Sequence, residues 1–276
     1  MKRTRVKNKR KGLISGGCLI TVLVLTLFAP VFTSHDPYAQ NLENILAPPM
    51  TASESDGGIA LLGTDQLGRD VLSRLLYGGR TSLLVGVVSA ILCGMIGSAL
   101  GVVAGYYRRV AGVIIMRLAD INLSVPTMLM AIMIVAVLGS TLFNTILVLT
   151  VTGWVSFARV VRSETLSLRE RNFVEAARAM GVSNFRVITR HILPNLSHTV
   201  ITLTTLQIAR MILLSASLSF LGLGIDVSSP SWGGMINDGR NYIMTAPWLS
   251  AIPGAAIAFT LVGINIFSDW LHENLG

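Results

Sequence analysis

Long uncharged hydrophobic runs alternate with short polar segments along this chain of 276 residues. Such runs cover residues 12–34, 81–107, 121–158 and 241–268, and residues 196–225 carry only His198 and Arg210 as polar interruptions with an ionisable group. A helix of about 20 apolar residues is long enough to cross a bilayer. Each run therefore predicts at least one membrane-spanning helix.

The run 121–158 is too long for one span, and Gly139-Ser140 offers a break within it. We therefore begin the third span near Gly112, with Arg117 and Asp120 inside it, and the fourth near Leu142. The predicted fold is an all-α membrane protein with six transmembrane helices, placed at residues 12–33, 81–106, 112–138, 142–160, 196–221 and 248–270.

Composition supports a membrane protein, because 52% of the residues are hydrophobic and only 13% are charged, whereas soluble domains carry roughly 25% charged residues. The N-terminal tail holds seven basic residues and no acidic residue, which predicts a cytoplasmic N-terminus. Six spans then return the C-terminus to the cytoplasm. With this topology, sixteen of the 22 basic residues are cytoplasmic, including Arg108, Arg109, Arg159, Arg162, Arg169, Arg171, Arg178, Arg186 and Arg190.

The net charge of +8 does not indicate nucleic-acid binding, since the basic residues lie where the topology requires them. Cys18 and Cys93 fall inside predicted spans and imply no disulfide. The first hydrophobic run is longer than the core of a signal peptide and lacks a clear cleavage site, so we interpret it as an anchor. Four regions result: a basic cytoplasmic tail at 1–11, the first anchor at 12–34, an extracytoplasmic segment at 35–80, and a core at 81–276 with a cytoplasmic loop at about 161–195.

This cytoplasmic loop contains signals for two short helices. Asn172 is a candidate N-cap with Glu175 three residues later, as in a capping box, and Gly181 suits the left-handed position after a helix. Ser183 can cap a second helix, and Pro194 limits its continuation. The loop is therefore predicted to form a bent pair of helices outside the membrane, in which Ala176 and Ala177 allow a partner to approach closely.

The order of Glu175, Ala176, Ala177, Gly181 and Leu193-Pro194 between two spans resembles the cytoplasmic motif of transmembrane subunits of binding-protein-dependent ABC importers. The resemblance implies the type I ABC importer permease fold, in which this element is the coupling helix against the ATPase. It assigns ATPase coupling to Glu175, Ala176, Ala177 and Gly181. The family usually has an aliphatic residue two positions before Leu-Pro, where this chain has His191.

Three further strings are similar to the dipeptide, oligopeptide and nickel permease subfamily, and they extend the resemblance from about Leu13 to Asp269. The chain's ending departs from the subfamily's usual charged one. Residues 63–74 also have the pattern of an amphipathic helix on the outer surface, with an ordinary surface role and a substrate-gating role equally open. The strings are Gly63-Thr64-Asp65-Gln66-Leu67-Gly68-Arg69-Asp70-Val71-Leu72-Ser73-Arg74, Ser217-Leu218-Ser219-Phe220-Leu221-Gly222-Leu223-Gly224 and Pro230-Ser231-Trp232-Gly233.

The resemblance implies a non-catalytic permease subunit in the inner membrane of a bacterial cell. It should pair with a homologous permease subunit, two ATPase subunits that bind ATP and Mg²⁺, and an extracytoplasmic substrate-binding protein, moving peptides by alternating access. Nickel, a metal chelate, glutathione or another small solute is the alternative cargo. No metalloprotease, phosphate-loop or nucleophile-elbow motif occurs, which disfavours a membrane enzyme, and a channel would not need the coupling element. We predict no cofactor or metal on this chain.

Three charged residues lie inside predicted spans. Arg117 and Asp120 are three residues apart and could form an ion pair on one helix face, with a structural role favoured over gating. Arg210 lies near the middle of the fifth span, where exposure to lipid costs about 2.5–3.5 kcal/mol. It should therefore face protein or water, and contact with another subunit or with a substrate carboxylate is equally open.

Overall fold

The computed structural model describes residues 2–33, 35–52, 59–226 and 229–275, with the backbone alone for residues 2–11 and Leu275. Glu54 and Asp56, which the sequence places in the outer segment, lie outside the described residues. The chain begins with α1 (Lys2–Leu27) and α2 (Ala29–Phe32). A non-helical segment follows, with η1 (Leu42–Asn44) and the antiparallel pair β1 (Thr51–Ala52) and β2 (Ile59–Ala60), in which Thr51 lies opposite Ala60.

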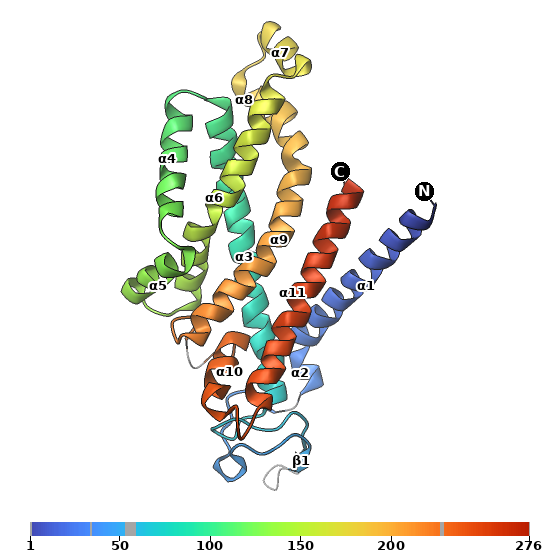
Figure 1. Cartoon of the computed structure of the whole chain (residues 1–276), viewed down its shortest axis with the longest axis vertical. Coiled ribbons are helices and arrows are strands. Elements are labelled where there is room, and N and C mark those ends of the chain that lie inside the picture. The colour runs from blue at the N-terminus through green and yellow to red at the C-terminus, as the bar shows by residue number, and fades with distance from the viewer. Residues whose placement is uncertain (1, 34, 53–58, 227–228, 276) are drawn as a thin grey trace.

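Three long helices, α3 (Val71–Tyr106), α6 (Leu142–Arg169) and α9 (Leu193–Phe220), form the centre of the bundle. The final helix, α11 (Trp248–Leu275), packs against α9 and α1. Figure 1 shows α7 (Asn172–Ala179) at one end of the molecule and β1 at the other. The N-terminal end of α1 and the C-terminal end of α11 both point toward the end that carries α7 (Figure 1).

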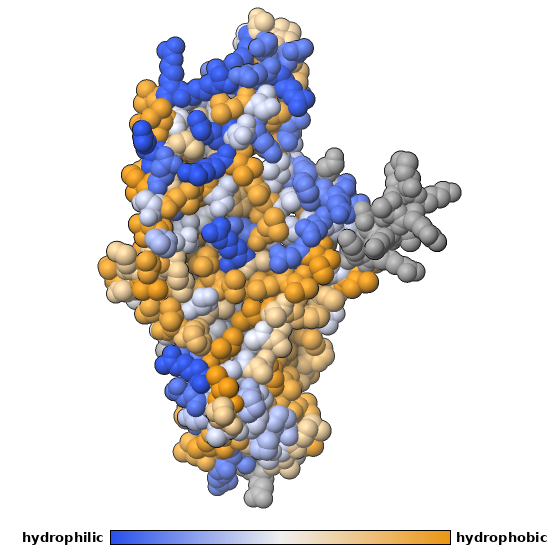
Figure 2. Space-filling model, in the orientation of Figure 1, coloured by the Kyte–Doolittle hydropathy of each residue, from blue (hydrophilic) through white to orange (hydrophobic). Residues whose placement is uncertain are grey.

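Among the described residues, four helices are long and apolar enough to span a membrane, and a bent pair raises this to five. The four are α3, α6, α11 and the continuous helix Asn184–Phe220, which contains α9. The apolar part of α1, Gly12–Leu27, is shorter than these. Hydrophobic residues cover the middle of the face in Figure 2, and hydrophilic residues gather at the end with α7. The fold is all-α, as the sequence predicts, but not every predicted span is a single straight helix.

The predicted third span is two helices, α4 (Val110–Ser124) and α5 (Thr127–Leu138), which meet at 89°. The break follows from Pro126, since a proline disfavours the helical conformation of the preceding residue, and Val125 is accordingly extended, with φ −104° and ψ 131°. The expected break at Gly139-Ser140 is confirmed, because Gly139 ends α5 with φ +83° and the hydroxyl of Thr141 caps α6.

Small residues on α3 allow it to pack closely against α6. A methyl group added at Gly101 would lie 2.8 Å from the carbonyl oxygen of Ala158, and one at Gly105 would lie 2.9 Å from that of Arg162. In lipid there is no hydrophobic driving force between helices, so close backbone packing of this kind stabilises their association instead. The partner of the small residues of α3 is therefore a helix of the same chain.

The predicted surface helix at residues 63–74 does not form as a separate element. Val71 is the first residue of α3, which continues into the predicted second span, and Asp70 is its N-cap. The outer connection after α9 is tightly turned, with the short helix α10 (Trp232–Gly239) and η3 (Arg240–Tyr242) packed between α9 and α11. Trp232 is buried and donates its indole N–H to the carbonyl of Leu75 at 2.9 Å. Its position is thus inside the protein.

Candidate functional site

The predicted coupling helix is α7, and its C-terminal end has the geometry that the sequence indicates. Gly181 has φ +77°, its N–H donates to the carbonyl of Arg178, and the N–H of Val182 donates to the carbonyl of Ala177. These two bonds form a Schellman motif, in which glycine is preferred because other residues are strained at positive φ. The end of α7 is therefore sharply defined.

The N-terminal end of α7 differs from the prediction. Asn172 is the first helical residue, and Arg171 occupies the N-cap position without a side-chain hydrogen bond. The carbonyl of Arg171 accepts from the N–H groups of Val174 and Glu175, at 2.9 and 3.1 Å. The N-cap is Arg171 and not Asn172, so the predicted capping box between Asn172 and Glu175 is wrong. The predicted helix itself is confirmed.

One face of α7 packs into the end of the transmembrane bundle. Val174 and Ala177 are buried in a hydrophobic cluster with Tyr106 of α3, Val161 of α6 and Ile192. Because the cluster joins α7 to three long elements, a displacement of α7 must be transmitted to them or must break this packing.

The opposite face of α7 is exposed. Glu175 and Ala176 are exposed, and Met180 and Phe185 are each 77% accessible. Ala177 is only 3% accessible, so it faces its own bundle and is not available to a partner, in contrast to the expectation for this residue. An exposed apolar patch with a polar rim is typical of a protein interface.

The second predicted helix is present but does not stop at Pro194. Ser183 precedes α8 (Asn184–Val187) without a side-chain hydrogen bond, and a π-helical turn, η2 (Ile188–Ile192), leads directly into α9. A proline has no N–H for the helical ladder, and widening by one residue accommodates it. The predicted bent pair is therefore α7 and the extended start of α9.

Tyr106, at the end of α3, connects α7 to the bundle through polar contacts. Its hydroxyl donates to Oδ1 of Asn184 at 2.6 Å and accepts from Nε of Arg178 at 3.3 Å. Its carbonyl accepts from Arg169 at 2.9 Å. The guanidinium groups of Arg178 and Arg169 lie 4.9 and 5.7 Å from the ring centre, in cation–π geometry. Nothing local in the sequence marks Tyr106, whose role depends on residues more than 60 positions away.

The structure places the three charged residues of the predicted spans as follows. Asp120 pairs with Arg159 of α6 at 2.7 Å, whereas the expected pair with Arg117 is not formed among the described residues. Both residues are exposed on α4, and the pair with Arg159 links α4 to α6 instead. Arg210 is exposed on α9 and makes a long contact of 3.5 Å to the hydroxyl of Ser156.

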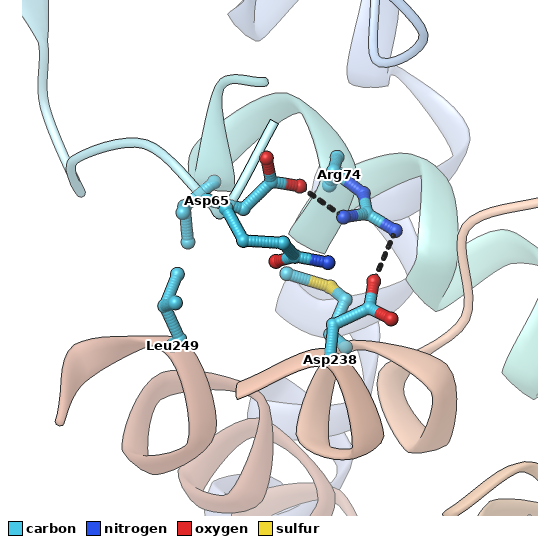
Figure 3. A pocket seen from close by; sticks show the side chains of 7 residues that line it. Asp65, Arg74, Asp238 and Leu249 are labelled. Carbon is cyan, nitrogen blue, oxygen red and sulfur yellow. Dashed lines mark hydrogen bonds and ion pairs between the residues drawn. The ribbon is translucent and has the colours of Figure 1, made fainter. Parts of the chain in front are cut away.

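The opposite end of the molecule contains a buried ionic cluster that sequence reasoning missed. Figure 3 shows Asp65, Arg74 and Asp238 pointing toward one another beside Leu249. Arg74 pairs with Asp65 and, at 3.1 Å, with Asp238 of α10, and Arg69 pairs with Asp65 at 2.7 Å. The adjoining cavity is only about 10 Å³. The cluster therefore ties the segment before α3 to α10, which is a structural role for part of the string 63–74.

Comparison with known proteins identifies the same architecture. Residues 97–276 match the family described as "binding-protein-dependent transport system inner membrane component", and residues 3–49 match the "N-terminal TM domain of oligopeptide transport permease C". A chain of the MetNI methionine ABC transporter in an inward-facing conformation superimposes with a TM-score of 0.59 at 19% identity, covering 74% of this chain and 96% of that chain.

Curated relatives match along most of the chain. The dipeptide transport system permease protein of Alkalihalophilus pseudofirmus is 40% identical over 97% of this chain and 86% of its own length. The probable D,D-dipeptide transport system permease protein of Escherichia coli is 38% identical, over 93% and 84% respectively. The glutathione transport system permease protein of Pectobacterium atrosepticum is 40% identical, over 78% and 71%. This chain therefore belongs to the family of inner-membrane permease subunits of binding-protein-dependent ABC importers.

Proposed function

We propose that this permease subunit imports short peptides by alternating access, in a pathway shared with a second, homologous permease subunit. The names of the dipeptide relatives support peptides as the cargo. The glutathione relative supports the related alternative, since glutathione is itself a small peptide-like solute. Nickel or a metal chelate is the less favoured cargo, without a comparable relative among those described above.

The proposed mechanism rests on the contrast between the two faces of α7, one of which is buried in the bundle and the other exposed. Its buried face joins the ends of α3, α6 and α9, and its other face exposes Ala176 and Met180. We propose that the exposed face docks in a groove of one of two ATPase subunits, which bind ATP and Mg²⁺. ATP-driven closure of these subunits would then move α7 and the helices attached to it between two arrangements. An extracytoplasmic binding protein would deliver the cargo at the opposite end.

This mechanism requires α7 and both termini to lie in the cytoplasm. The basic tail and the arginines near α7 favour that orientation through the positive-inside rule. The N-terminal end of α1 and the C-terminal end of α11 point toward the α7 end, in agreement with it (Figure 1). The ionic cluster of Figure 3 then belongs to the extracytoplasmic end.

A cysteine scan of α7 tests the docking. Cysteine at Ala176 should cross-link to a cysteine in the ATPase groove, because Ala176 is exposed, whereas cysteine at the neighbouring Ala177 should cross-link at least about tenfold less, since a 3% accessible side chain is rarely reached. The yield is measured on gels of inverted membrane vesicles. Because the ATPases are cytoplasmic, the same cross-link reports the orientation. Equal yields at both positions, or none at Ala176 in an assembled transporter, would refute the docking face.

Arg210 offers a test of the translocation pathway. We propose that this exposed guanidinium, which has one weak contact to Ser156, faces the pathway and contacts the cargo's carboxylate. Replacing Arg210 with leucine should reduce uptake of a free dipeptide about tenfold or more, since a hydrogen bond to a charged group contributes about 1.5–3 kcal/mol. Uptake of the same dipeptide with an amidated C-terminus should change little.

The same experiment includes an assembly measurement. If the arginine instead contacts another subunit, the Arg210→Leu variant should lose ATPase subunits or the second permease subunit during purification, and the carboxylate contact is then wrong. Arg210→Lys serves as the control, because it retains the positive charge and should recover part of the uptake. Wild-type uptake by the leucine variant would exclude both roles.

A further inference from the structure

A hollow of about 760 Å³ lies beside α7, where α3 ends, α4 begins and α6 ends. It is separate from the exposed face of α7, because its lining includes neither Ala176 nor Met180. The proposed docking of the ATPase does not use this hollow. Its walls are formed by Tyr106, Tyr107, Arg108, Arg109, Val110, Ala111, Arg169, Arg178 and Asn184.

Positive charge dominates the hollow. Four arginines line it, and among the described residues the one carboxylate that pairs with any of them is that of Glu170, which accepts a hydrogen bond from Arg108. This bond and the charge of Arg108 lower the pKa of Glu170. The Glu170 carboxylate therefore stays ionised and paired with Arg108. Within the described part of the chain, Arg109, Arg169 and Arg178 form no ion pair with a carboxylate.

Two of these arginines are held in place before any ligand arrives. Arg169 and Arg178 are partly buried, and both contact the ring of Tyr106, whose hydroxyl and carbonyl fix them further. A preorganised guanidinium loses less rotational freedom when it binds an anion. Converging guanidinium groups of this kind recognise the oxygens of a phosphate group.

The rim of the hollow is apolar on the side of α4. Tyr107 is 46% accessible, Val110 is 72%, and Val113 and Ile114, one turn further along α4, are 57% and 55%. A soluble anion would gain nothing from this surface, but a molecule with a charged head and hydrocarbon chains would use both parts. Tyrosine is also typical of the boundary between headgroups and hydrocarbon.

We propose that the hollow binds the phosphate of an anionic phospholipid from the cytoplasmic leaflet, with its acyl chains along α4. This inference rests on the proposed orientation of the permease, because basic pockets at the cytoplasmic side meet anionic headgroups there. The bound phosphate touches Arg178 of α7 and Arg169 of α6. It therefore holds the coupling helix against the bundle, and the lipid composition of the membrane influences coupling.

Native mass spectrometry of the assembled transporter, released from detergent with added cardiolipin or phosphatidylcholine, tests the proposal. The wild type should retain cardiolipin in preference to phosphatidylcholine. Arg109→Gln removes the charge of a side chain that makes no hydrogen bond among the described residues, and it should weaken cardiolipin retention. The double variant Arg109→Gln/Arg169→Gln should weaken it about tenfold. Arg186→Gln is the matched control, because Arg186 is an exposed arginine outside the hollow, and it should retain cardiolipin like the wild type.

Three outcomes would overturn the proposal. The first is equal loss of cardiolipin in the Arg186→Gln control and in the double variant, which indicates unspecific attraction. The second is displacement of cardiolipin by millimolar inorganic phosphate, which identifies a site for the free anion. The third is loss of ATPase subunits from the Arg109→Gln variant with unchanged lipid, which indicates a protein contact. The masses also report assembly, so failure of the importer function would be seen as missing ATPase subunits in the wild type, independently of lipid retention.

Discussion

Replacing Gly181 with proline should abolish peptide transport while the chain remains in the membrane and ATP hydrolysis continues. Proline fixes φ near −65° and has no N–H, whereas Gly181 has φ +77° and donates to the carbonyl of Arg178. Losing this conformation opens the Schellman motif and separates α7 from the buried contacts of Val174 and Ala177. A proline at a position whose conformation it cannot adopt costs about 3 kcal/mol, which lowers the population of molecules with an intact C-terminal end of α7 by roughly a hundredfold. Uptake and ATPase activity, measured on the same proteoliposomes, check the result.

Two control variants separate coupling from general damage. Gly181→Ala keeps the N–H and costs about 1–2 kcal/mol for a left-handed residue, so its transport should lie between those of the proline variant and the wild type. Gly222→Pro introduces the same defect at the other end of the bundle, since Gly222 also has φ +77° and follows α9 in the same hydrogen-bond pattern. That variant should leave the cross-link from Ala176 unchanged. Normal transport by Gly181→Pro at normal expression would contradict the lever mechanism.

Local chemistry made α7 predictable, but it did not reveal which of its faces is buried. Glycine at a positive φ is a strictly local requirement, and Gly181 was found from sequence for that reason. Ala176 and Ala177 are both small residues, and their difference in burial depends on how the helix docks on Tyr106 and Ile192. Docking is a property of distant segments. The structure is therefore needed to identify which face of α7 is exposed.

The same distinction explains the third span and its charges. Hydropathy detects apolar length but not direction, so the 89° bend at Pro126 was hidden within one predicted helix. Spacing of three residues allows a contact between Arg117 and Asp120 but does not require it, and Arg159 of α6 reaches Asp120 instead. The role of Arg210 stays a prediction, since a contact of 3.5 Å to Ser156 does not identify its principal partner.

Replacing Arg74 with methionine should destabilise the chain more than any change to its exposed charges. The guanidinium is buried between Asp65 and Asp238 (Figure 3). Its removal leaves Arg69 as the one cation paired with these carboxylates among the described residues. Removing one partner of a buried ion pair costs about 3–5 kcal/mol when the remaining charge loses its compensation. Arg69 still pairs with both carboxylates, so the expected loss lies toward the lower end of that range. Denaturant unfolding of the purified chain in detergent measures the loss. Arg108→Met is the control, since its pair with Glu170 is exposed to solvent and such pairs contribute little to stability.

A second substitution distinguishes lost charge pairing from lost packing. Asp65→Asn removes a buried negative charge but retains Oδ1, which accepts from the N–H groups of Leu67 and Arg69 at 2.9 and 3.0 Å. In the Arg74→Met background, Asp65→Asn should therefore restore part of the stability, whereas in the wild type it should lower stability. The difference between the effects of Asp65→Asn in the two backgrounds is the coupling energy of a double-mutant cycle. Additive losses would show that Arg74 acts through the bulk of its side chain, because methionine lacks the charge but fills much of the same space.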